Sequence, residues 1–93
     1  MTFRQYFLKE IALNMLTPEE EQWAKIYAHM VYEAILIKKE YEKTKDESYK
    51  IMYEDKNNKL MEFYQYVLSQ GTDKKLFNNT YLKYYEQLKK QQR

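Results

Sequence analysis

Glycine and proline do most to determine where a chain can turn, and this 93-residue chain contains one of each, Gly71 and Pro18. An all-β fold needs many tight turns, and such turns draw heavily on both residues. The same scarcity leaves no glycine-rich loop that could cradle a phosphate group. The sequence therefore argues against a turn-rich β fold and favours helices.

Cysteine is absent, which excludes a disulfide scaffold, a cysteine-ligated zinc site and a thiol nucleophile. The apolar fraction of 44% and the charged fraction of 32% are typical of a globular chain, and the length suits a single domain over residues 1–93. No apolar run approaches the roughly 18–20 residues that span a bilayer. The charged N-terminal turns lack the apolar stretch of a secretory signal. We expect a cytoplasmic protein with no membrane partner.

Helix starts and apolar spacing predict the elements. Thr17 can cap a helix whose first residue is Pro18, and Glu20 completes a Thr-x-x-Glu capping box. Apolar residues recur every three or four positions before and after this point, which is the period of a helix with one buried face. The pattern predicts one short helix and three longer ones, at about residues 2–15, 18–43, 45–70 and 73–91.

The other helix boundaries are less sharply marked. Thr44 and Glu47 offer a second capping box, so we expect the second helix to end there, although no glycine or proline enforces the break. One continuous helix over residues 18–70, forming a long rod, is the alternative. A kink or short turn is expected at residues 57–58, Gly71 is expected as a left-handed C-cap, and Thr72 or Asp73 as the next N-cap.

The helix from Pro18 has the least polar middle of the four. Between Ala28 and Ile37 only His29 and Glu33 are fully polar. A helix that is apolar nearly all round is contacted on more than one side, so we expect this helix to be central. The fold prediction is all-α, a small up-and-down helical bundle.

No residue pattern predicts an enzyme. His29 and Glu33 lie on one helical face, but a metal site would need further ligands from other helices. The acidic clusters at residues 19–21 and 46–47 lie at helix N-termini, where carboxylates stabilise the helix dipole. We therefore expect no catalytic residue, no metal and no cofactor.

The last helix is basic, although the net charge of the whole chain is only +2. Lysines near phosphates and aromatic rings near bases are features of proteins that bind single-stranded nucleic acid. Tyr81, Tyr84 and Tyr85 share a stripe with Phe77 and Leu88, however, so most of them should face the core. The lysines that would contact nucleic acid are Lys74, Lys75, Lys83, Lys89 and Lys90.

Aromatic residues are in excess, with eleven tyrosines, four phenylalanines and one tryptophan. Tyrosine and tryptophan are enriched at protein interfaces and their hot spots. Four large side chains project away from the main apolar seams and are the candidates for a partner-binding surface: Tyr32, Leu36, Ile51 and Tyr66.

The sequence therefore predicts a small non-enzymatic protein that occludes or bridges a protein partner. Phage- and mobile-element-encoded inhibitors of host machinery, anti-CRISPR proteins among them, share this size and this lack of motifs. One alternative is a nucleic-acid-binding accessory protein that uses the basic last helix. Another is a homodimeric structural spacer, since self-association is the commonest use of an exposed apolar patch.

Overall fold

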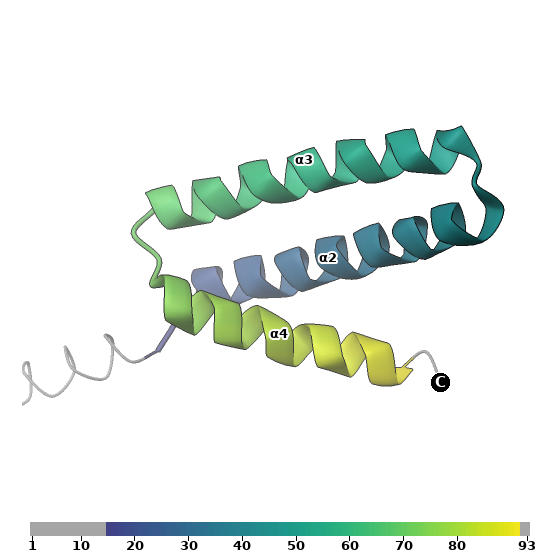
Figure 1. Cartoon of the computed structure of the whole chain (residues 1–93). Helices are drawn as coiled ribbons and strands as arrows, with labels where there is room; N and C mark the ends of the chain where they lie inside the picture. The colour runs from purple at the N-terminus through teal and green to yellow at the C-terminus, as the bar shows by residue number, and fades with distance from the viewer. Residues whose placement is uncertain (1–14, 92–93) are drawn as a thin grey trace, which may run out of the picture.

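The computed structural model describes residues 15–91 and consists there of three helices: α2 (Pro18–Thr44), α3 (Glu47–Ser69) and α4 (Lys74–Gln91) (Figure 1). Residues 15–91 contain no β-strand, so the all-α prediction is confirmed. The short helix predicted at residues 2–15 lies outside the described residues, apart from its last position. Within residues 15–91, none of the helices combines the length and the hydrophobicity needed to cross a membrane.

The N-terminus of α2 is fixed by the predicted capping box. The Thr17 hydroxyl accepts a hydrogen bond from the Glu20 backbone N–H at 3.1 Å, and the Glu20 carboxylate accepts one from the Thr17 N–H at 2.9 Å. Two of the N–H groups that a helix start leaves without partners are thereby satisfied. Pro18 occupies the first turn, where a missing N–H costs nothing.

A two-residue break separates α2 from α3, so the two form a hairpin and not one long rod. The predicted Thr44–Glu47 capping box is wrong: Thr44 is the last residue of α2, and Asp46 caps α3 by accepting from the Ser48 N–H at 2.9 Å. Hydrogen bonds from Ser48 hold the pKa of Asp46 below its ordinary value. Lys45 turns the chain in the left-handed conformation, with φ of 59°.

The remaining boundaries follow local chemistry. The expected kink at residues 57–58 is wrong, because α3 runs through both asparagines without interruption. Gly71 adopts a φ of +85° after the end of α3, the left-handed conformation expected there. Asp73 caps α4 by accepting from the Leu76 N–H at 2.9 Å, whereas the Thr72 side chain is buried.

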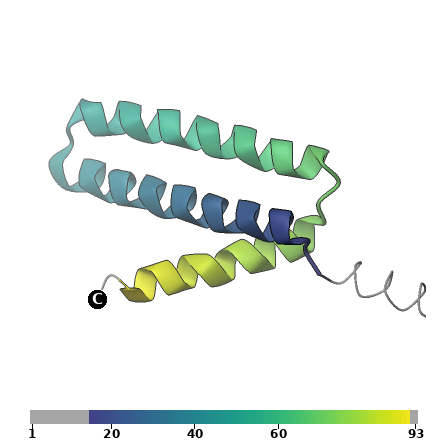
Figure 2. The same cartoon turned by 180° about the vertical axis from the view of Figure 1, so that it is seen from behind.

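The expectation of a central helix is confirmed, since α2 packs against both α3 and α4. Figures 1 and 2 show α3 and α4 on either side of α2, with α3 antiparallel to α2 and α4 running in the direction of α2. Between α3 and α4, the contacts that the structure describes lie near their connecting loop, where Tyr64 contacts Phe77 and donates a hydrogen bond to Asn78. The three helices therefore form an open arrangement around α2.

The core lies where all three helices come together. Ala24 of α2, Val67 of α3 and Phe77 of α4 are fully buried. Tyr27 lies among four rings, those of Phe63, Tyr64, Phe77 and Tyr81, with centroid distances between 4.7 and 6.4 Å. Burial is the main cause that raises the pKa of Tyr27 and of Tyr81, so both hydroxyls stay protonated at neutral pH.

Candidate functional site

The histidine–glutamate pair does not form a reactive centre. His29 is exposed beside a groove between α2 and α4, whereas Glu33 forms an ion pair with Lys56 of α3. Among residues 15–91, no three histidine, aspartate or glutamate side chains lie close enough together to hold a metal ion. The role that the structure shows for Glu33 is to link two helices.

The acidic cluster at the start of α2 contacts α4. The Tyr84 hydroxyl donates a hydrogen bond of 2.6 Å to the Glu21 carboxylate, and the Lys25 ammonium lies 5.3 Å from the centre of the Tyr84 ring. The hydrogen bond to Glu21 is the main cause that raises the pKa of Tyr84. These contacts link the two helices, which is a structural role for Glu21.

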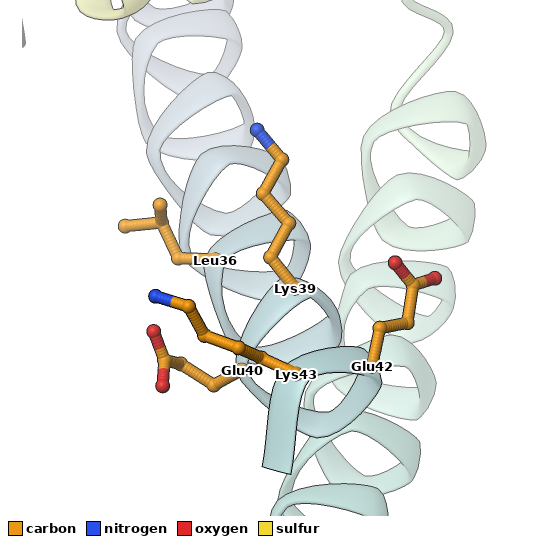
Figure 3. A pocket seen from close by; sticks show the side chains of 5 residues that line it. All are labelled: Leu36, Lys39, Glu40, Glu42 and Lys43. Carbon is orange, nitrogen blue, oxygen red and sulfur yellow. The ribbon is translucent and has the colours of Figure 1, made fainter. Parts of the chain in front are cut away.

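One surface hollow lies along the C-terminal half of α2 (Figure 3). All five residues that line it come from this single helix: Leu36, Lys39, Glu40, Glu42 and Lys43. In Figure 3, Leu36, Glu40 and Lys43 extend to one side of α2, and Glu42 extends toward the neighbouring helix. A small-molecule site is concave, with apolar walls on several sides. The hollow therefore lacks the enclosure that such a site requires.

The four residues predicted to bind a partner do not share one surface. Tyr32 is partly buried, with its ring 6.4 Å from that of Tyr85 on α4. Leu36 is exposed in the hollow just described. Ile51 and Tyr66 are both exposed on α3, but they are 15 positions apart, which corresponds to about 22 Å along the helix. Tyr66 is the one that is exposed and also contacts a large aromatic ring on the neighbouring helix, that of Trp23.

An apolar patch that includes Tyr66 lies where α2 and α3 pack together. The rings of Trp23 and Tyr66 meet edge to face, with centroids 5.7 Å apart and planes at 70°. Ile26 follows Trp23 by three residues and Phe63 precedes Tyr66 by three, so each is a neighbour on its own helix. We call these four residues, Trp23, Ile26, Phe63 and Tyr66, the Trp23–Tyr66 patch.

The patch is open to solvent on a rigid base. Tyr66 is 50% exposed and Ile26 is 40% exposed, while Trp23 and Phe63 are half-buried and pack against the core. The Glu33–Lys56 ion pair links the same two helices about 10 Å further along α2 from Ile26. Apolar side chains on fixed helices beside a charged pair are what a protein interface offers, with an apolar centre and a polar rim.

Three members of the patch, Trp23, Ile26 and Phe63, were not among the predicted binding residues. Trp23 begins the apolar seam of α2, and that position assigns it to the core. Its ring instead lies at the margin of the core, where Tyr66 contacts it. Ile26 could have been predicted from the sequence, because it is a large apolar residue outside the apolar seam of α2 and follows a tryptophan by three positions.

The lysines predicted to contact nucleic acid are all exposed on α4. The tyrosines between them face α2, as their shared stripe predicts: Tyr81 contacts Tyr27, Tyr84 contacts Glu21, and Tyr85 contacts Tyr32. These partly buried rings are engaged within the fold and are poorly placed to stack on bases.

Comparison with protein-family models, with curated proteins and with solved structures gives no match for this chain. Its function is therefore inferred from the chemistry of its surfaces.

Proposed function

We propose that this protein is a non-enzymatic interaction protein that binds a protein partner through the Trp23–Tyr66 patch. The observation that supports the proposal is the edge-to-face pair of Trp23 and Tyr66, which is held on two helices and remains open to solvent. Tryptophan and tyrosine are the residues most enriched in interface hot spots, together with arginine.

Rigid placement makes the patch suited to binding. A side chain that is already held in one orientation loses little conformational entropy when a partner covers it. Phe63 is held by stacking on Tyr27, at 6.4 Å and 14° between ring planes, and Trp23 packs against the buried core. The patch is therefore preorganised.

The biological role that fits best is occlusion or bridging of a macromolecular partner in the cytosol, as a phage or mobile-element inhibitor would do. The small size and the cysteine-free composition support this role. A homodimer that uses the same patch is the second candidate, because half-exposed apolar residues on two adjacent helices also suit a self-complementary interface.

Two isoleucine variants test the proposal. Ile26→Asp places a charge inside the patch, and Ile51→Asp places the same charge at a more exposed isoleucine elsewhere on the surface. A tagged protein would be used to capture partners from a lysate of its own source cells after nuclease treatment, and the affinity for the recovered partner would then be measured with purified proteins.

We expect Ile51→Asp to bind like the wild type, and Ile26→Asp and Tyr66→Ala each to lose about thirtyfold in affinity, corresponding to about 2 kcal/mol. Circular dichroism would show that all variants stay helical. Equal binding by Ile26→Asp and Ile51→Asp would reject the patch as the interface. Light scattering of the isolated protein tests whether it is a homodimer. If the wild type is a dimer and Ile26→Asp is a monomer, the partner is a second copy of the chain.

A further inference from the structure

Charge is distributed unequally among the three helices. α4 carries five lysines and one glutamate, whereas α2 carries six acidic and four basic residues and α3 carries four acidic and three basic residues. The positive charge of the described part of the chain is therefore concentrated on α4, on one side of the acidic α2–α3 hairpin (Figure 1).

Three of the α4 lysines project from the side opposite its packed stripe. The packed side of α4 is set by Phe77, which is fully buried. At 100° per residue, Lys75, Lys83 and Lys90 lie within about 80° of one another and roughly opposite Phe77. Successive lysines in this set are about 12 and 10.5 Å apart along the helix axis. We call these three residues the α4 lysine row.

Most of the other groups near the row are polar or already paired, and the exception is Leu82, an apolar side chain that is 46% exposed beside Lys83. Asn79 is exposed between Lys75 and Lys83 and can donate a hydrogen bond. Glu86 lies between Lys83 and Lys90 and forms an ion pair with Lys89 at 3.7 Å, while the Lys89 ammonium also lies 5.4 Å from the centre of the Tyr85 ring. The row itself forms no ion pair with any residue in the described part of the chain.

The chemistry of the row favours phosphate over a protein surface. Lysine is depleted at protein–protein interfaces, whereas lysine and asparagine side chains commonly contact the phosphates of nucleic acids. The tyrosines of α4 face α2, so recognition of bases by stacking is not available on this side. What remains is contact with the sugar–phosphate backbone, which does not depend on sequence.

We propose that the α4 lysine row binds the phosphate backbone of a nucleic acid. This site uses a different surface from the Trp23–Tyr66 patch and does not depend on that patch. A protein with both surfaces could hold a protein partner and a nucleic acid at once.

Binding of short labelled DNA, single-stranded and duplex, measured by fluorescence anisotropy over a range of salt concentrations, tests the proposal. The variant Lys75→Gln/Lys83→Gln/Lys90→Gln removes the row. The variant Lys39→Gln/Lys43→Gln/Lys50→Gln removes the same charge from α2 and α3. Glu86→Gln removes the one carboxylate of α4, and Glu62→Gln is its control on α3.

We expect removal of the row to reduce the slope of log affinity against log salt by about 2 on single-stranded DNA, since each phosphate contact contributes about 0.7. The control triple variant should keep most of the wild-type slope, and Glu86→Gln should bind severalfold more tightly than Glu62→Gln. Absence of DNA binding at low salt, or equal weakening by the two triple variants, would overturn the proposal. Equally tight binding of polyglutamate would also overturn it, by showing no preference for phosphate.

Discussion

Tyr27 is the residue at which all three helices meet, because its ring contacts two rings of α3 and two of α4. Aromatic pairs at such distances contribute about 0.5–1.5 kcal/mol each beyond the area that they bury. Removal of this ring should therefore weaken both helix–helix contacts of α2 at once.

We expect Tyr27→Ala to lower the free energy of unfolding by about 2–4 kcal/mol, because truncation of a large aromatic in a core leaves a cavity. Tyr27→Phe keeps all four ring contacts and should change it by less than about 1 kcal/mol. Urea denaturation followed by circular dichroism measures both values. Tyr32→Ala, which removes a contact with one ring, is the control, and a loss as large as that of Tyr27→Ala would refute the central role of Tyr27.

At the scale of single residues, the sequence predicted local chemistry better than surface position. The Thr17 cap depends on neighbours within three residues, and that information is contained in the local sequence. The exposure of Trp23 depends on where α3 crosses α2, which no spacing within α2 specifies. Periodicity assigns a residue to a face of its helix, but not to the middle or the margin of the core.

At the scale of the element, the turn between α2 and α3 deviates most from what its residues prefer. Lys45 has a φ of 59°, a conformation that costs a residue with a side chain about 1–2 kcal/mol relative to glycine. Its N–H still donates to the Tyr41 carbonyl at 2.7 Å, and its ammonium lies 5.5 Å from the centre of the Tyr41 ring. The exposed cation–π contact offsets only about 0.5 kcal/mol of this cost.

Lys45→Gly should therefore raise the free energy of unfolding by about 0.5–1 kcal/mol, since glycine adopts this conformation without strain. Lys45→Ala keeps the backbone strain and loses the contact with Tyr41, so the free energy of unfolding should stay the same or fall slightly. Urea denaturation compares the two variants. A Lys45→Gly protein less stable than the wild type would show that the lysine side chain contributes more than the strain of its backbone.

This turn also shows where element boundaries could be predicted from the sequence. The position of the break was predicted, although the Thr44–Glu47 capping box from which it was predicted does not form. The capping residue itself was not, since Thr44 and Asp46 both carry a suitable oxygen. The Thr44 hydroxyl donates to the Glu40 carbonyl within α2 and accepts from the Asp46 N–H, and the Asp46 carboxylate caps α3.

At the scale of the whole molecule, the fold class and the central position of α2 followed from composition and periodicity, because an all-round apolar helix needs neighbours on two sides. The placement of α3 and α4 on either side of α2 did not follow from them. The apolar stripes of α3 and α4 indicate that each helix must bury one face. They do not indicate that both helices pack against α2.

The open arrangement predicts uneven stability along the α2–α3 hairpin. The fully buried residues Ala24, Val67 and Phe77 lie where all three helices meet, whereas Figures 1 and 2 show α4 diverging from α2 toward the hairpin turn. Amide hydrogens at residues 38–44 and 48–53 should exchange faster than those at residues 24–30 and 62–67. Hydrogen-exchange mass spectrometry measures this difference, and uniform protection along both helices would contradict it.

Because α3 and α4 separate beyond their connecting loop, the α2–α3 hairpin can change in length. Whole turns inserted on both sides of Lys45 and Asp46 would lengthen the hairpin without displacing α4, because α4 packs on the opposite flank of α2. The distance that the hairpin reaches from the core can therefore vary independently of the basic helix. Such a protein could be adapted to partners of different size by insertion alone.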